Sequence, residues 1–374
     1  MRIAFVYSSK DGMASSIQSR RFEENHEEDD PPLDLLAECD SDETIEAIGR
    51  ALGERHDIIP IEADDEAYLQ LKEIRPDLVF NIAEGLVGPN RESHIPSICE
   101  MLGIPYTGSD PLTLGICLDK SRAKEILSYH KIPTPPFWVV ENGHGISLRV
   151  KLPAVVKPLH EGSSKGIKDN AVVRTRDELK ERVREIRAIY KEPVIIEEFL
   201  PGREFTVGVL GNLPHIEILP IVEIDHSQLP PCANPVYSYE AKWVWDQPSD
   251  PLAIFRCPAE LPDIKNRIED IVRRTVEVLR IRDWARVDVR LDERGEPNIL
   301  EVNPLPGVLP NPEDNSCLPK AARTAGYSYS ALLHRVVDAA ATRYGLRNGK
   351  RKHHRGDRLQ LLRSCHQQAE RAPL

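Results

Sequence analysis

Four residues in two apolar segments late in the chain have the types and spacing of a metal and nucleotide site. Arg286 and Asp288 are two residues apart in the first segment, and Glu301 and Asn303 are two apart in the second. Alternate residues of a strand point to the same face, so each pair shares a face of its own strand. If the two strands form a hairpin, Asp288, Glu301 and Asn303 converge.

Two carboxylates and an amide oxygen form a hard oxygen cluster that suits Mg²⁺ and the phosphates of a nucleotide. Arg286 beside them can stabilise negative charge that develops on a reacting group. The alternative is a solvent-exposed polar hairpin face. Neighbours such as Val287, Val289 and Ile299 favour burial instead, and buried acids that face one another repel unless a cation lies between them.

A second candidate element is the segment from Lys157 to Gly166, in which a lysine ends a predicted strand and a loop with two glycines and two serines follows. The backbone N–H groups and hydroxyls of such a loop can surround phosphate oxygens, and the lysine can reach the same phosphates. The spacing differs from that of a Walker A loop. An ordinary turn remains the alternative.

A third element runs from Val194 to Phe205, where an apolar strand leads to acidic residues and a Pro-Gly turn. Backbone groups at a strand end can bind an adenine edge, and a carboxylate can accept hydrogen bonds from ribose hydroxyls. Spacing alone gives this nucleotide-binding role little support.

Taken together in this order, these elements resemble the ATP-grasp superfamily, and more closely its D-alanine–D-alanine ligase-like branch. The resemblance covers about residues 75–345. It is carried by Leu118–Arg122, Lys157–Gly166, Ile196–Leu200, Glu204–Val207, Arg286-x-Asp288, Glu301-x-Asn303, Pro105–Ser109, Tyr239–Lys242, Cys257–Ala259 and Pro306-Gly307.

The resemblance implies an ATP-dependent carboxylate–amine ligase, a step of peptidoglycan biosynthesis in this branch, that forms an acylphosphate and then an amide. D-alanine is the best single candidate for both substrates. It implies ATP and two Mg²⁺ ions, which Mn²⁺ can replace. The nucleotide phosphates would be held by Lys120, Lys157, Ser164 and Lys242, and its adenine and ribose by Glu197, Leu200 and Glu204. The metal ions would be held by Asp288, Glu301 and Asn303. The catalytic residues would be Arg286, Ser163 and Gly307, and the substrate would contact Trp243 and Ser316.

The segments that would bind the amino acids depart from the family pattern. The family's glutamate after the first strand, which helps hold the first substrate's amine, has no counterpart that can be assigned in the segment starting at Ser8. The segment Asn81–Glu92 is also altered, and Trp243 stands where the family has a tyrosine. An indole can donate a hydrogen bond but cannot accept one. The ATP and metal residues are therefore expected to be intact and the amino-acid pockets to be rebuilt.

The elements that must position these residues follow from hydrophobic patterning. Short apolar runs predict buried strands, and 3.6-residue periodicity predicts helices; Asp40 and Glu43 are expected to form a capping box. The expected strands are Arg2–Tyr7, Asp57–Glu62, Asp77–Ile82, Leu152–Pro158, Pro193–Glu197, Glu204–Leu210, His215–Glu223, Trp284–Leu291 and Pro297–Val302, and the expected helices are Thr44–Leu52, Arg176–Tyr190, Leu261–Leu279 and Tyr329–Tyr344.

This order predicts an α/β fold with α+β lobes, and the resemblance makes it an N-terminal Rossmann-like pre-ATP-grasp domain followed by a two-lobed ATP-grasp fold. The expected domains are residues 1–125, with an acidic insert at 19–42, a central lobe at 126–205 and a C-terminal lobe at 206–346. The insert is interpreted as a mobile, solvated loop rather than a binding element. Residues 347–374 form a basic tail expected to be disordered.

The composition of the 374 residues limits the functional classes. With 60 acidic and 49 basic residues the net charge is −11, which argues against general affinity of the main body for nucleic acid. No apolar run is long enough to span a membrane. The seven cysteines form no C-x-x-C pair, as expected for structural thiols of a reduced cytoplasmic protein.

Three functional alternatives stay open on the sequence: a ligase for another amino-acid pair, a small-molecule kinase, and a non-catalytic ATP-binding regulator. The expected partners are small-molecule carboxylate and amine substrates, and the family implies a homodimer.

Overall fold

The structure is a computed structural model that describes residues 1–15, 34–141, 145–147, 149–245 and 252–346. The predicted basic tail and most of the predicted acidic insert lie outside these residues. Within them, no helix combines the length and apolar character needed to cross a bilayer. The cysteines of this part of the chain are all unpaired thiols.

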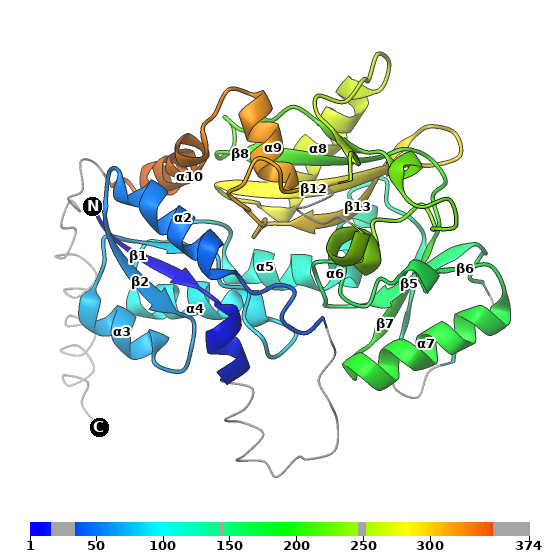
Figure 1. The fold of residues 1–374 in the computed structure, drawn as a ribbon, viewed down its shortest axis with the longest axis horizontal. Coiled ribbons are helices and arrows are strands. Elements are labelled where there is room, and N and C mark those ends of the chain that lie inside the picture. Colours follow the sequence, from blue (N-terminus) through cyan, green and yellow to red (C-terminus); the bar gives the residue numbers. More distant parts are fainter. Residues whose placement is uncertain (16–33, 142–144, 148, 246–251, 347–374) are drawn as a thin grey trace, which may run out of the picture.

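The N-terminal part is a three-stranded parallel sheet in the order β2-β1-β3 with helices on both faces (Figure 1). Alternation within β1 explains the two layers: Ile3 and Phe5 pack with α2, whereas Ala4 and Val6 pack with α3 and α4. The elements are β1 (Arg2–Tyr7), α2 (Asp42–Gly53), β2 (Asp57–Glu62), α3 (Ala67–Ile74), β3 (Leu78–Asn81) and α4 (His94–Leu102).

Two helices, α5 (Pro111–Leu118) and α6 (Lys120–Tyr129), lead into a four-stranded antiparallel sheet in the order β4-β7-β5-β6. The helix α7 (Arg176–Tyr190) covers this sheet with Leu179, Val183 and Ile186 and begins at a capping box formed by Thr175 and Glu178. The strands are β4 (Phe137–Val140), β5 (Ala154–Pro158), β6 (Val172–Val173) and β7 (Val194–Glu198).

The third sheet follows the order β11-β10-β8-β12-β13, with β9 paired to β8. Its β8, β12 and β13 are the long strands that carry the candidate chemistry, and α8 packs on one face while α9 and α10 pack on the other (Figure 1). The elements are β8 (Glu204–Leu210), β9 (Glu217–Ile218), β10 (Val222–Ile224), β11 (Phe255–Arg256), α8 (Lys265–Leu279), β12 (Trp284–Leu291), β13 (Pro297–Asn303), α9 (Cys317–Thr324) and α10 (Tyr329–Arg343).

Most predicted strands and helices are confirmed within a few residues, and the differences have local causes. The strand expected at His215–Glu223 is divided into β9 and β10, because Pro220 between them has no N–H for a sheet ladder. The capping box expected from Asp40 and Glu43 is wrong. The cap of α2 is Ser41, whose side chain accepts a hydrogen bond from the Thr44 N–H at 3.3 Å.

The predicted domain boundaries at residues 125 and 205 fall inside α6 and β8, so a division of the chain would lie a few residues away from them. The division into three domains itself stays a prediction.

The interpretation of the acidic insert as a solvated loop is wrong for its described end. Asp34 and Glu38 are both buried, and both bond to residues of the loop that follows β5. A buried carboxylate is stable only when donors or cations satisfy it, and the loop and its neighbours supply them.

Candidate active site

The hairpin of β12 and β13 brings the predicted metal-binding residues together. In its antiparallel register Asp288 lies opposite Glu301 and Arg286 lies opposite Asn303. Asp288 accepts hydrogen bonds from Arg286 at 3.1 and 3.0 Å, from Asn303 at 3.1 Å, and from the hydroxyl of Thr206 on β8 at 2.6 Å. The sequence-based expectation that these side chains converge is confirmed.

The two carboxylates of the hairpin are held by positive side chains. Burial and the charge of Glu301 raise the pKa of Asp288, although Arg286 opposes the rise. Burial also acts to raise the pKa of Glu301, but Lys120 and Lys157 outweigh it and hold this pKa below its usual value. Lys120 Nζ lies 3.1 Å from Glu301 Oε1. Two acids can therefore face each other here because cations lie beside both.

The donor set of the hairpin fits a magnesium ion that also binds a nucleotide. Among the described residues, no group of three or more His, Cys, Asp or Glu side chains is placed to hold a metal by itself. Mg²⁺ commonly takes only one or two carboxylates and completes its shell with water and phosphate oxygens. Asp288, Glu301 and the amide oxygen of Asn303 provide that partial shell.

The loop that follows β5 has the backbone of a tight, preformed cradle. Ser163 and Ser164 both have left-handed conformations, with φ of 48° and 62°, and the Lys165 N–H closes a turn on the Gly162 carbonyl at 2.8 Å. Gly166 has a φ of 66°, and a Cβ there would collide with the ring of Pro158.

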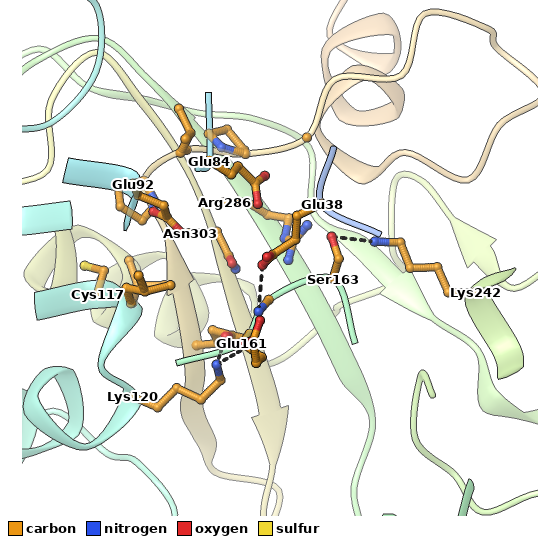
Figure 2. Close-up of a pocket in the computed structure, with 18 residues that line it drawn as sticks. Glu38, Glu84, Glu92, Cys117, Lys120, Glu161, Ser163, Lys242, Arg286 and Asn303 are labelled. Carbon is orange, nitrogen blue, oxygen red and sulfur yellow. Dashed lines mark hydrogen bonds and ion pairs between the residues drawn. The ribbon is translucent and has the colours of Figure 1, made fainter. Parts of the chain in front are cut away.

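Both serines of this loop lie near the segment that carries Lys242, another residue predicted to hold phosphate. The Ser164 hydroxyl donates to the carbonyl of Tyr237 at 2.9 Å, and the Ser163 hydroxyl lies 3.4 Å from Lys242 Nζ (Figure 2). Burial and the charge of Arg286 lower the pKa of Lys242 to about 8. The side chain of Trp243, next along the chain, falls outside the described part of the structure, so its predicted contact with substrate stays a prediction.

A buried carboxylate on β7 fixes the lysine at the end of β5. Glu197 is 2% exposed and pairs with Lys157 at 2.7 Å and with Lys124 at 3.0 Å. Although burial opposes ionisation, the two lysines lower the pKa of Glu197 to about 2. The structure thus gives Glu197 a clear task in orienting Lys157, and its predicted contact with adenine or ribose stays a prediction.

Glu204 on β8 is held in a similar way. It accepts a hydrogen bond from Arg290 at 2.8 Å and lies 2.9 Å from His226 Nε2. Burial would raise its pKa, but these two partners lower it to about 2. The side chain of Leu200 is buried, and it lines the larger of the two cavities described next.

Two adjoining cavities collect the predicted site residues. A cleft of about 330 Å³ is lined by Lys157, Ser163, Ser164, Glu197, Leu200, Glu204, Lys242, Arg286, Asp288, Glu301, Gly307 and Ser316. A smaller cavity of about 80 Å³ shares part of this lining and adds Lys120 and Asn303. Every predicted site residue except Trp243 therefore faces one of the two cavities, and their individual roles stay predictions.

Sequence reasoning missed three carboxylates that enter the smaller cavity from the N-terminal part (Figure 2). They are Glu38, Glu84 and Glu92. Burial and the charge of Glu38 raise the pKa of Glu92 to about 8 although Arg91 opposes the rise, and burial together with Glu38 also raises the pKa of Glu84. Carboxyl groups in this condition favour a cation as ligand. For Glu84 and Glu92 the sequence signal was the departure of the segment Asn81–Glu92 from the family pattern, and for Glu38 it was the acidic insert.

The cationic and polar partners Lys124, Arg290, His226 and Thr206 were missed as well. Lys124 could have been found, because it follows Lys120 by four residues and so shares its face of α6. His226 and Arg290 meet Glu204 only through the pairing of β8 with β10 and β12, which no local pattern reveals.

His160, in the loop after β5, has a structural role at the wall of the site. Its Nδ1 lies 3.1 Å from Glu192 and its Nε2 lies 3.7 Å from Asp119. Burial acts to lower its pKa, but these two carboxylates raise it to about 9. This pairing is typical of a structural residue in the wall of the site rather than of a proton-transfer group.

Comparison with known proteins agrees with these features. Residues 130–338 match the family model described as the D-ala D-ala ligase C-terminus. An uncharacterized protein of Sinorhizobium fredii is 37% identical over 71% of this chain and 75% of its own length. The D-alanine–D-alanine ligase of Aquifex aeolicus is 33% identical over 79% of this chain and 93% of its own. A crystal structure of the D-alanine–D-alanine ligase from Bacillus anthracis is 27% identical, with a TM-score of 0.65 over 91% of this chain and 98% of that one.

The pairing of His160 predicts a stability effect that depends on pH. Its pKa in the folded protein lies above the value of about 6.5 expected when unfolded. The stabilisation is therefore fully present below pH 6.5 and is lost as the pH rises through about 9. We expect His160→Gln to lower the free energy of unfolding by roughly 2 kcal/mol at pH 6 and by much less at pH 9.5, measured by urea denaturation.

The matched control is His215→Gln, which changes an exposed histidine on another loop. It should have little effect at either pH. An equal loss of stability at both pH values for His160→Gln would show that the contact does not depend on the imidazolium charge.

Proposed function

The chain belongs to the D-alanine–D-alanine ligase family, and we propose that it joins the carboxylate of one amino acid to the amine of another while ATP is converted to ADP and phosphate. It is an ATP-grasp, D-alanine–D-alanine ligase-like enzyme, as the sequence predicted. The observation that carries the proposed reaction is the pair Asp288 and Glu301, which face each other across a hairpin in the same cleft as Lys157 and the Gly/Ser loop.

In the first step the substrate carboxylate attacks the γ-phosphorus of ATP. A carbon–oxygen–phosphorus linkage forms, the bond to the β-phosphate oxygen breaks, and ADP leaves. Lys120, Lys157 and Lys242 would hold the phosphates, and Ser163 and Ser164 would contact them from the loop. Transfer of this kind depends on positioning and electrostatic stabilisation rather than on a protein nucleophile.

Magnesium would be held by Asp288, Glu301 and Asn303, and when bound it neutralises charge on the phosphates. On the protein side, Arg286 and Lys120 would have to share these carboxylates with the ion. The partial shell of oxygen donors described above supports this assignment.

In the second step the amine of the second amino acid attacks the carbonyl carbon of the acylphosphate. A tetrahedral intermediate forms, the carbon–oxygen bond to the phosphate then breaks, and the amide forms as phosphate leaves and the nitrogen loses its proton to phosphate or solvent. The guanidinium of Arg286 lines both cavities, and although burial opposes its charge, Asp288 raises its pKa so that it stays positive. With the Gly307 N–H, it would stabilise the negative oxygen of that intermediate.

The amino acids would be recognised by charge at the two ends of the site. Glu84 and Glu92 would bind the ammonium group of the first substrate. Burial raises their pKa values, and a bound cation offsets the free-energy cost of ionising these buried carboxyl groups. Ser316 precedes α9, and its side chain does not cap that helix. The N–H groups at the start of α9 would therefore favour the carboxylate of the second substrate.

D-alanine is the first choice for both substrates. Three relatives named D-alanine–D-alanine ligase are 32–34% identical to this chain over most of its length. The experiment is a phosphate-release screen over pairs of D- and L-amino acids with ATP and Mg²⁺, followed by mass spectrometry. A ligase gives free phosphate and a new amide. A stable phosphorylated product would indicate a kinase, and tight ATP binding without turnover would indicate a regulator; either outcome would overturn the proposal.

The hairpin assignment predicts that Glu301→Gln abolishes turnover. The substitution removes one metal-binding charge with almost no change in volume, so we expect a loss of at least 100-fold in kcat, about 3 kcal/mol, with the fold retained by circular dichroism. The control is Glu293→Gln, the same change at an exposed position in the turn of the same hairpin. Near-normal turnover of Glu301→Gln at saturating Mg²⁺ would contradict the assigned site.

The lowered pKa of Lys242 predicts an alkaline limb in the pH profile. Above about pH 8 the free enzyme loses the charge on Lys242, so kcat/KM for ATP should fall as the pH rises through that value. Lys242→Arg, which keeps its charge, should remove this limb even if its rate is lower. The same limb in both proteins would show that another group titrates.

A further inference from the structure

The described end of the acidic insert reaches into the active site. We define the strap as residues 34–40, which run from the end of the insert to the cap of α2. We propose that Glu38 and Asp34 of the strap are positioning residues that hold the Gly/Ser loop (residues 161–166) so that Ser163 and Ser164 face the nucleotide cleft. This inference rests on the proposed function only in treating that loop as the one that contacts phosphate.

Glu38 binds the first half of the loop. Its Oε1 accepts a hydrogen bond from the Gly162 N–H at 2.8 Å, and its Oε2 pairs with Lys165 Nζ at 3.0 Å (Figure 2 draws the bond to Gly162). Arg91 pairs with the same carboxylate at 2.8 Å. A Cβ at position 162 would collide with the Glu38 carboxylate, so the glycine is required for this close approach.

Asp34 binds the second half of the loop. Its Oδ2 accepts hydrogen bonds from the Gly166 N–H at 3.0 Å and from the hydroxyl of Tyr190, at the end of α7, at 2.5 Å. Burial and the Asp34 carboxylate raise the pKa of Tyr190, so the phenol keeps its proton and acts as the donor. The Arg182 guanidinium bonds to the Gly166 carbonyl from the opposite side.

The charge of Glu38 is balanced by neighbours from two other parts of the chain, the Gly/Ser loop and the segment that carries Arg91. Glu161 of the loop also pairs with Arg91, at 3.3 Å, and with Lys165. Burial favours a neutral Glu38, but Lys165 and Arg91 lower its pKa to about 2. The carboxylate is therefore ionised throughout the range in which an enzyme would be assayed, and the grip on the loop does not depend on pH there.

The contacts of Glu38 and Asp34 lie on either side of the two residues with strained backbone. Ser163 and Ser164 hold left-handed conformations, which cost free energy in residues other than glycine unless neighbouring contacts impose them. Hydrogen bonds at Gly162 and Gly166 fix the chain on either side of them. Both serines line the cleft between these two points.

Carboxylates bonded to the N–H groups of a phosphate loop have a second interpretation, in which they compete with phosphate. The placement of the bonds favours positioning, because they lie on the flanking glycines rather than on the two serines. The two interpretations predict opposite changes in the KM for ATP when the carboxylates are removed.

The test uses the full-length chain with Glu38→Gln and Asp34→Asn, and Glu43→Gln as the matched control. Glu43 is an exposed carboxylate in the first turn of α2, just beyond the strap. Hydrogen exchange of peptides that cover residues 159–168 is measured without substrates. We expect exchange in the loop at least tenfold faster in both strap variants, and unchanged in the control.

The kinetic readout separates positioning from general destabilisation. With each substrate varied in turn, the strap variants should raise the KM for ATP about tenfold and leave the KM of the amino acid within twofold. Glu38→Asp, which keeps the charge, should recover part of the loss. Unchanged loop exchange in both variants, or a lower KM for ATP with kcat retained, would overturn the proposal.

Failure of the strap and failure of the proposed reaction are distinguishable. Hydrogen exchange requires no turnover, so it decides the strap even if the wild-type protein forms no amide. Should Glu38→Gln fail to fold because Arg91 and Lys165 lose their partner, Asp34→Asn keeps the test intact, since its partners are a backbone N–H and a phenol.

Discussion

The structure of the site depends on one electrostatic constraint: two carboxylates face each other across a buried hairpin. Asp288 and Glu301 occupy opposite positions of β12 and β13, where like charges repel strongly unless cations compensate them. Arg286 and Lys120 supply that compensation in the structure. The same positive groups are suited to a nucleotide, because the charge that steadies the acids also attracts phosphate.

The remaining charges extend this arrangement outward from the hairpin. Glu197 positions Lys157. Glu204 is held by Arg290 and His226. The strap residue Glu38 connects Arg91 to the Gly/Ser loop. Glu197, Glu204 and Glu38 each have at least one cationic partner. Such networks are set by tertiary contacts rather than by local sequence. Glu84 and Glu92 differ from the paired acids, because burial raises their pKa values and leaves them suited to a cationic ligand.

Much of the fold, and the convergence of most candidate site residues on one cleft, could be predicted from the sequence. The strand Arg2–Tyr7 was predictable because most of it is an apolar run. In Trp284–Leu291 apolar residues alternate with Arg286, Asp288 and Arg290, and this two-residue periodicity predicted both the strand and the polar face of the hairpin. The helices α3, α4, α5, α6 and α9 were missed, since each has only eight to ten residues, too few turns for apolar spacing alone to identify a helix. Glu38 was misinterpreted because composition reports local charge density, whereas its burial depends on partners 53 and 127 residues away along the chain.

The most direct test of the account is a crystal structure of the protein with Mn²⁺ and a non-hydrolysable ATP analogue, in which anomalous scattering locates the metal. The account predicts one or two anomalous peaks at roughly 2.0–2.3 Å from oxygens of Asp288, Glu301 and Asn303, bridged to the phosphates beside Lys157. Manganese bound elsewhere, with Asp288 still paired to Arg286 and Glu301 to Lys120, would contradict it.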